Sequence, residues 1–481
     1  MLFNSISYFI FFPIVVILYF HLQHKYRCSL LLIAGCIFYM WFLPKYILIL
    51  ALLIAIDFFA ALLIERSDKN RKKIYLTISI TSTCLVLFVF KYFNFFSSNI
   101  TALAQFLNLK YSAHIFEIAL PVGLSFHTFQ SLAYVIEVYR GKQKAEKNFS
   151  IYALYVLFFP QLVAGPIERP YNLLPQLKKE QRFSIANFFM GLEFIIKGLL
   201  KKVVIADHVA EIVNQVYGDP FSYTGTPLII ATVLFSIQIY CDFSGYTDIA
   251  IGSAKILGID LMKNFNHPYL AMGIADFWKR WHISLSSWFR DYLYIPLGGS
   301  RVDKLSRLYL NIFIVFTVSG LWHGAKWTFI IWGILHGIYW IIEDYGKRLF
   351  SGNHLASSIF KLHIIKISSI GVTFSLVCFS WIFFRANGLS DAIHIATNLF
   401  NFSAGFNFSL STFKFGFIEF NTILIILALT LLKYFLQECF PTRISNLKNN
   451  ISFVRVYYSF QLSLVCLFWV RNSESFIYFQ F

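Results

Sequence analysis

Long apolar runs recur along this chain, and they decide what it can fold into. A helix needs about 20 predominantly apolar residues to cross the roughly 30 Å hydrocarbon core of a bilayer. Lipid offers no hydrogen bonds to backbone groups, so runs of this length cross as helices. The runs that are long enough, or nearly so, are residues 1–20, 28–43, 46–64, 74–97, 366–384, 420–437 and 453–470. The sequence therefore predicts an all-α polytopic membrane protein.

The composition supports this fold class and excludes several kinds of partner. Only 14% of the residues are charged, whereas an ordinary soluble domain has roughly 25%. The net charge of +17 fits cationic cytoplasmic loops, because no basic stretch carries the interleaved aromatic residues of a nucleic-acid site. The seven cysteines form no CxxC pair and match no zinc or disulfide pattern. We expect membrane lipid as the surroundings, no nucleic-acid partner and no bound metal.

The distribution of cations predicts the orientation in the membrane. The segment 65–73 carries five cations and 140–149 carries four, whereas 98–117 between them carries only Lys110. Cationic loops lie in the cytoplasm. The first run has no cation before it, and the last run follows a cationic loop, so both termini are expected outside the cytoplasm. We expect a multi-pass protein of the bacterial inner (plasma) membrane.

The middle third, residues 121–345, is less regular than the rest. Its apolar stretches are broken by Pro, Gly and ionisable residues, and irregular backbone at membrane depth is tolerated where it lines a cavity or is buried in protein. We expect roughly 10–12 helices in one integral membrane domain, 1–481. Its parts are N-terminal helices (1–118), a core (119–345), and C-terminal helices with a tail (346–481).

Polar residues within this apolar sequence are candidates for a functional site, because they are expensive in a membrane. These candidates are Gln161, Glu168, Arg169, Gln238, Asp242, Ser244, Asp248, the polar residues from Asp276 through Asp291, His323 and His336.

His323 has the most favourable setting for catalysis. Gly320 and Gly324 flank it, and glycine lets another backbone or a ligand approach closely. A neutral imidazole that can accept a proton is what a general base needs; the alternative is a core histidine with satisfied hydrogen bonds. His336 follows 13 residues later, about 20 Å further along a continuous helix, so the two would not share a metal ion.

The segment 274–292 has the pattern of an amphipathic helix. Apolar residues recur at three- and four-residue steps, with Lys279 and Arg280 on the opposite side and His282 on the border. Such a helix lies at an interface or lines a wet cavity. The plainer alternative is an interfacial helix whose histidine bonds a backbone carbonyl.

Seven motifs resemble those of a known family. They are PVGLSFHTFQSLAYVIEVYRG (121–141), FFPQLVAGPIERP (158–170), IYCDFSGYTDIAIGSAKILGI (239–259), NFNHPY (264–269), FWKRWHISLSSWFRDYLYIPLGGSR (277–301), SGLWHGAKWTFIIWGILHG (319–337) and FIYFQF (476–481). The chain resembles the membrane-bound O-acyltransferases, in the bacterial branch that acylates alginate and cell walls. His127 departs from the family pattern, where an aromatic residue is more frequent.

The resemblance implies a fold, a reaction and roles for residues. It implies a ring of helices around a central tunnel, and transfer of an acetyl group from cytosolic acetyl-CoA to an extracytoplasmic polysaccharide such as alginate, with no bound cofactor. His323 matches the principal active-site histidine, the expected base, and His282 matches the second histidine motif. Five further residues are expected to support the site. Asp242, Trp322 and Gln161 would shape the tunnel, and Lys279 and Arg280 would bind the donor. Asp242 could instead orient an imidazole or be an ordinary buried aspartate.

The C-terminal tail and the rival functions complete these expectations. Tyr478 is a candidate relay that receives the acetyl group and passes it to an extracytoplasmic acetyltransferase partner; alternatively, the tail only plugs the tunnel. D-alanyl transfer to teichoic acid and peptidoglycan acetylation are the rivals within the family. A transporter or flippase is the rival from another class, although the two similar halves of such proteins are missing from this sequence.

Overall fold

The structure is a computed structural model that describes residues 1–41, 44–109, 111, 121, 123–162, 165–350, 363–402, 425, 428, 451–469 and 476. All the regular secondary structure of these residues is helical. Five helical segments within them are long and apolar enough to cross a membrane: Pro44–Arg66, Lys69–Phe106, Thr226–Ile256, Leu305–His323 and Lys366–Arg385. The prediction of an all-α polytopic membrane protein is confirmed.

Two compact units make up the described chain. Unit 1 comprises Met1–Ile195 and Ile249–Lys263, and unit 2 comprises Ile196–Asp248 and Asn264–Phe481. The expectation of one domain with a ring of helices around a tunnel stays a prediction, as does the total of 10–12 helices.

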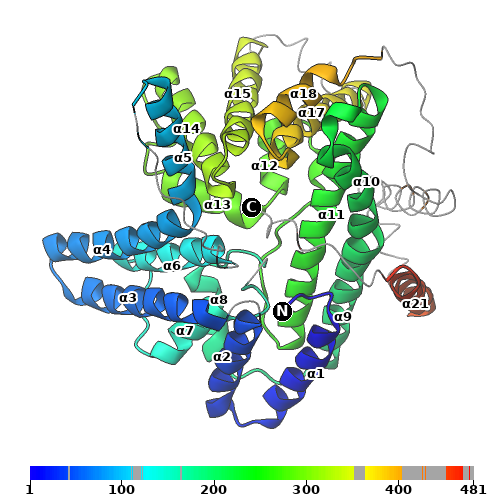
Figure 1. Cartoon of the computed structure of the whole chain (residues 1–481). Coiled ribbons are helices and arrows are strands. Elements are labelled where there is room, and N and C mark those ends of the chain that lie inside the picture. Colours follow the sequence, from blue (N-terminus) through cyan, green and yellow to red (C-terminus); the bar gives the residue numbers. More distant parts are fainter. Residues whose placement is uncertain are drawn as a thin grey trace. The chain divides into compact units, whose positions relative to one another are not determined.

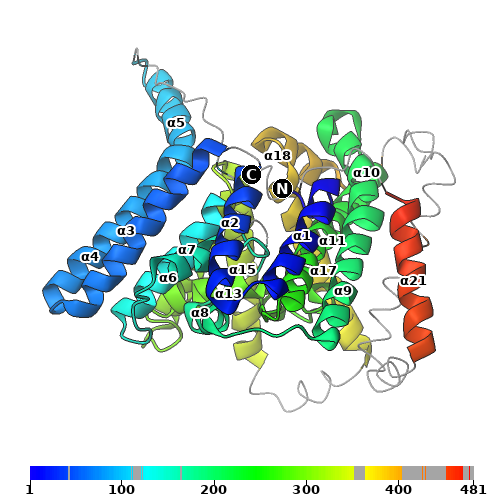
Figure 2. The ribbon, with the colours of Figure 1, turned by 90° about the horizontal axis from the view of Figure 1, so that it is seen from below.

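Unit 1 holds the N-terminal helices, which are coloured from blue through cyan to green in Figure 1. They are α1 (Ile6–His21), α2 (His24–Met40), η1 (Pro44–Tyr46), α3 (Ile47–Arg66), α4 (Lys69–Leu87), η2 (Phe88–Tyr92), α5 (Phe93–Phe106), α6 (Leu124–Tyr139), α7 (Phe149–Leu157), α8 (Pro170–Lys178) and most of α9 (Ile185–Leu199). Helices α3 and α4 lie side by side, as Figures 1 and 2 show. Helix α2 packs on α7 so closely that a Cβ on Gly35 would lie 2.1 Å from the carbonyl oxygen of Leu157.

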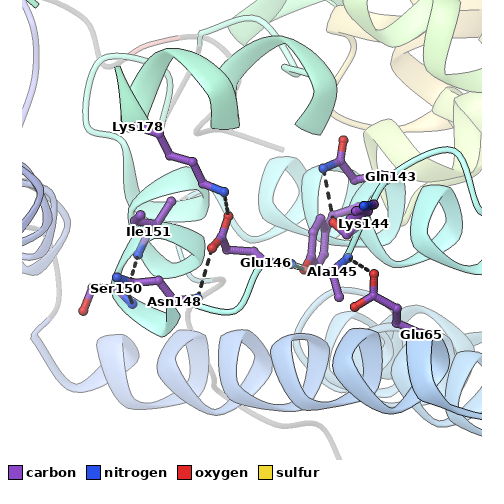
Figure 3. Close-up of polar contacts among 10 residues, drawn as sticks. Glu65, Gln143, Lys144, Ala145, Glu146, Asn148, Ser150, Ile151 and Lys178 are labelled. Atoms are coloured by element: carbon purple, nitrogen blue, oxygen red, sulfur yellow. Dashed lines mark hydrogen bonds and ion pairs between the residues drawn. The ribbon is translucent and has the colours of Figure 1, made fainter. Parts of the chain in front are cut away.

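The loop between α6 and α7 is held in place by a buried glutamate. One carboxylate oxygen of Glu146 pairs with the Lys178 ammonium on α8 at 2.5 Å, and the other accepts a hydrogen bond from the backbone N–H of Asn148 (Figure 3). The Asn148 side chain in turn caps the first turn of α7 by accepting from the backbone N–H groups of Ser150 and Ile151. Glu146, the single acidic residue of the cationic segment 140–149, thus connects this loop to α8 and to the start of α7.

Unit 2 contains the remaining helices. They are the end of α9, η3 (Leu200–Ala206), α10 (Asp207–Gly218), η4 (Pro220–Ser222), α11 (Thr226–Ile256, to Asp248 in this unit), η5 (Pro268–Leu270), α12 (Ile274–Arg280), α13 (Ile283–Phe289), η6 (Arg290–Tyr294), α14 (Leu305–His323), α15 (Trp327–Phe350), α17 (His363–Arg385), α18 (Leu389–Asn398) and α21 (Ile451–Leu467). Helices α14 and α15 form a hairpin, and α17 packs on α15.

Most of the apolar runs form helices close to their predicted limits. The runs at 1–20, 28–43 and 453–470 become α1, α2 and α21, although each of these helices has fewer than 18 residues. The run at 420–437 lies almost entirely outside the described residues.

Candidate active site

Two glycines bring α14 and α15 together beside His323. A Cβ on Gly320 would lie 2.3 Å from the carbonyl oxygen of Phe329, and one on Gly333 would lie 2.3 Å from that of Phe316. Only a hydrogen atom fits at such positions, so the two backbones touch. The hairpin places His323, the last residue of α14, against the first turns of α15.

His323 is enclosed by aromatic rings. Its imidazole is buried, with ring centroids 4.8 Å from Trp322, 5.0 Å from Trp332 and 5.3 Å from Phe384. These residues come from α14, α15 and α17. Such a wall restricts access of water to the imidazole, which strengthens the electrostatic interactions made there.

His336 lies on a separate helix from His323, so the assumption of one continuous helix, on which the separation of about 20 Å rested, is wrong. Helix α14 ends at His323 and α15 begins at Trp327, which turns the chain back on itself. The indole of Trp332 lies 5.0 Å from both imidazoles. The two histidines therefore share one neighbouring ring.

His282 occupies a break between two short helices, and the prediction of one helix over 274–292 is also wrong. Its backbone is left-handed (φ 43°, ψ 55°) between α12 and α13, a conformation that few non-glycine residues adopt. Asn264 stabilises the break: its backbone carbonyl accepts from the N–H of Ile283, and its Oδ1 accepts from the N–H of Ser284.

The imidazole of His282 is buried at this break. Its Nδ1 lies 3.1 Å from Oδ1 of Asn264, and its ring meets Phe243 edge-on at 4.7 Å. Burial lowers the pKa of His282 to about 3, so its imidazole is neutral at pH 7. A neutral ring held by one nitrogen can position a substrate through the other.

Asp242 belongs to a buried group of charges that the sequence reasoning missed. The Lys202 ammonium lies 2.9 Å from Asp242 on α11 and 2.7 Å from Asp207 on α10, with all three side chains no more than 3% exposed. Beside them, Lys201 pairs with Asp248 at 2.7 Å. Lys201, Lys202 and Asp207 stand in an otherwise apolar run, and this pattern could have indicated the buried group of charges. The pairing is compatible with an ordinary buried aspartate as well as with a site role, so the tunnel and orienting roles of Asp242 stay predictions.

A pocket of about 430 Å³ opens between α12, α13 and the α14–α15 hairpin. Trp278, Lys279, Arg290 and Ser319 are among its lining residues, and Ser319 lies one helical turn before His323. Of the two donor-binding candidates, Lys279 lines this pocket, whereas Arg280 pairs with Asp276 at 2.9 Å.

The tail reaches the surroundings of His282. Phe476 is fully buried, with its ring 4.3 Å from Tyr246 and 5.8 Å from Phe243, the residue that also contacts His282. Tyr478 lies outside the described residues, so its role as a relay stays a prediction.

Gln161 belongs to unit 1 and the two histidines to unit 2. It is buried and donates a hydrogen bond from Nε2 to the carbonyl oxygen of Tyr155 at 3.0 Å. Its role in a tunnel stays a prediction. Across the described part of the chain, no three His, Cys, Asp or Glu side chains gather as they would around a metal ion.

Comparisons with known proteins agree on one family. The model of the membrane-bound O-acyltransferase family matches residues 33–384. The peptidoglycan O-acetyltransferase of Helicobacter pylori is 36% identical over 430 residues, covering 82% of this chain and 79% of that protein. The probable alginate O-acetylase AlgI of Pseudomonas aeruginosa is 35% identical over 401 residues, covering 83% and 74%.

A third relative is more distant. The teichoic acid D-alanyltransferase of Bacillus subtilis is 28% identical over 284 residues, which cover 55% of this chain and 68% of that protein. All three relatives are named for acyl transfer rather than transport, and the match of the family extends over most of the chain. The chain belongs to the membrane-bound O-acyltransferase family, and it is a multi-pass membrane enzyme that transfers acyl groups.

Proposed function

We propose that the protein transfers an acetyl group from cytosolic acetyl-CoA toward a hydroxyl of an extracytoplasmic polysaccharide. One observation carries this choice of acyl group: relatives named for O-acetylation align with over four-fifths of the chain, whereas the D-alanyltransferase aligns with 55%. The polysaccharide would be alginate-like or another surface glycan. We place the enzyme in the inner membrane with both termini outside the cytoplasm.

His323 acts as the general base in this proposal. Its imidazole takes the proton of the attacking hydroxyl, the hydroxyl oxygen bonds to the thioester carbon, and the C–S bond breaks. The proton then passes from His323 to the leaving thiolate, which gives an acetyl ester and CoA. The buried aromatic setting of His323 and the pocket one turn away support this role. His282 positions the acceptor or the acyl group.

Lys279 provides a testable contact to the donor. We expect Lys279→Ala to raise the KM for acetyl-CoA by roughly 10- to 150-fold, because a charge-assisted hydrogen bond to phosphate contributes about 1.5–3 kcal/mol. Steady-state kinetics of the purified enzyme would measure this. Arg280→Ala should have a smaller effect, since Arg280 is paired with Asp276.

Two controls make the Lys279 test specific. Lys304 is exposed and does not line the pocket, so Lys304→Ala should leave the KM unchanged. S-acetylpantetheine carries the same thioester without phosphate, and its KM should not respond to Lys279→Ala. Equal effects on both donors would exclude a phosphate contact.

Tyr478 is the proposed relay on the outer side. Its hydroxyl would receive the acetyl group from CoA and pass it to an extracytoplasmic acetyltransferase partner that modifies the glycan. The burial of Phe476 against Tyr246 and Phe243, close to His282, supports a held tail.

The Tyr478→Phe substitution tests this relay, because it keeps the ring and removes the acceptor oxygen. We expect glycan acetylation to be abolished in cells while the protein reaches the membrane normally. Mass spectrometry of the wild-type C-terminal peptide should show an acetyl group on Tyr478. Wild-type levels of glycan acetylation in Tyr478→Phe would contradict the relay and favour the alternative, in which the tail only plugs the tunnel.

Labelled substrates test the function as a whole. Cells fed labelled acetate should lose label from one surface glycan when the gene is deleted, and chemical analysis of that glycan would name the acceptor. The purified enzyme should release thiol from acetyl-CoA. Release of D-alanine from a carrier-protein thioester, with none from acetyl-CoA, would instead establish the D-alanyl alternative.

A further inference from the structure

Two ring N–H groups lie buried on one face of α15 beside His323. Trp332 and His336 are four residues apart, so their side chains project from the same face of the helix. Both are fully buried, and their ring centroids are 5.0 Å apart. Trp332 also lies 5.0 Å from the imidazole of His323. The ring of Trp332 therefore neighbours the proposed base, and the ring of His336 lies on the helix face directly beside Trp332.

The hydrogen bond between Trp278 and His336 determines which nitrogen of His336 carries its proton. The indole Nε1 of Trp278 can only donate, and it donates to Nδ1 of His336 at 3.3 Å. An imidazole that accepts at Nδ1 carries its proton at Nε2. His336 is thus fixed as a donor through Nε2.

Neighbouring rings hold both donors in one orientation. Phe277 and Phe316 lie nearly parallel to the imidazole of His336, each 6.2 Å away at 10° and 22°. Trp381 stacks on Trp332 at 5.8 Å and 19°. Donors held in this way do not have to reorganise when charge develops near them.

Neither donor has an acceptor among the described residues. Nε1 of Trp332 and Nε2 of His336 are both buried without a hydrogen bond there. Burying a donor unsatisfied costs about 1–3 kcal/mol, and such groups in native proteins often serve a ligand or a reaction. A single ligand oxygen that accepts two hydrogen bonds would satisfy both donors.

We propose that Trp332 Nε1–H and His336 Nε2–H form the oxyanion hole of this acyltransferase. When the hydroxyl oxygen attacks the thioester, the carbonyl oxygen becomes negative, and these two groups would donate to it. The charge returns to the carbonyl bond as the C–S bond breaks, so neither donor gains or loses a proton. The inference rests on the proposed role of His323 as the base.

Three substitutions separate this role from a packing role. His336→Asn places an amide oxygen where Nδ1 was, so it can still accept from Trp278, but it removes the donor at Nε2. His336→Gln does the reverse, because its amide N–H reaches the Nε2 position. Trp332→Phe keeps an aromatic ring and removes its N–H.

The kcat of each variant should depend on whether it retains the hydrogen-bond donor, and not on how closely its side chain preserves the packing. Loss of one oxyanion donor costs about 10²–10³-fold in kcat, so His336→Asn and Trp332→Phe should each lose that much with little change in KM. His336→Gln should keep at least about tenfold more activity than His336→Asn. Near wild-type kcat in folded His336→Asn, or less activity in His336→Gln than in His336→Asn, would overturn the proposal.

The assay distinguishes failure of this inference from failure of the proposed donor. Thiol release from acetyl-CoA is measured for the wild-type enzyme and for each variant in nanodiscs. The rate of each variant is then divided by the wild-type rate. If wild type uses a carrier-protein thioester instead, the proposed acetyl-CoA donor is wrong, and the same ratios are taken with that thioester. Melting temperatures identify misfolded variants; should His336→Asn misfold, the kcat of Trp332→Phe decides.

Discussion

His323→Ala is expected to reduce acyl transfer by about 10²–10⁴-fold, the contribution of a positioned general base. The imidazole is buried among Trp322, Trp332 and Phe384, and alanine leaves no group there to take the proton of the hydroxyl. In cells this amounts to near-complete loss of glycan acetylation. Thiol release by the purified variant, together with its abundance in the membrane, measures the effect.

His323→Gln is the matched control for shape. Glutamine restores a polar side chain of similar length but cannot act as a base at neutral pH, so it should be as inactive as alanine. A well-expressed His323→Ala variant with wild-type activity would remove His323 from the mechanism. If His323→Gln were substantially more active than His323→Ala, His323 would act through a hydrogen bond and not as a base.

Lys202→Met is expected to lower the stability of the protein by about 3–5 kcal/mol, because removing one partner leaves buried charge uncompensated. Lys202 lies between Asp207 and Asp242, and all three are almost completely buried. Methionine preserves the length of the side chain and its apolar packing. Thermal or denaturant unfolding in detergent measures the loss, and membrane abundance should fall with it.

A second lysine–aspartate ion pair, which is more exposed to solvent, serves as the control for the loss of stability. Lys255 lies 2.7 Å from Asp260, whose side chain is 70% exposed, and an exposed pair contributes about 0–1 kcal/mol. Lys255→Met should therefore unfold almost as wild type does. Adding Asp207→Asn and Asp242→Asn to Lys202→Met should recover part of the stability. Equal losses for the two lysines would contradict the buried-charge argument.

The features that could be predicted from sequence are those that depend on local composition. The run at 46–64 became α3 (Ile47–Arg66) because its apolar length alone requires a membrane-spanning helix. The glycines beside His323 predicted a close approach at that point, which Phe329 makes. Family motifs supplied the identity of the two histidines, and their catalytic roles stay predictions.

The features that sequence reasoning missed depend on distant partners. The break at His282 is stabilised by Asn264, 18 residues earlier, whose contacts no helical wheel contains. Lys202 was not among the predicted site residues, because its partner Asp242 lies 40 residues away in the sequence, on another helix. His336 seemed remote from His323 because the helix was assumed to continue where Gly324 ends it.

Because the backbone at His282 is left-handed, selection for folding and selection for enzymatic activity should favour different amino acids at this position. Folding alone favours glycine, asparagine, aspartate or histidine at a positive φ, and it disfavours β-branched residues there. The proposed role of His282 in positioning substrate would favour histidine alone among these, because it needs a second ring nitrogen. A library randomised at this codon would therefore yield one ranking when sorted for protein abundance and another when sorted for product. Substitutions that preserve abundance but lower product formation would measure the contribution of His282 to the reaction, separately from its contribution to folding.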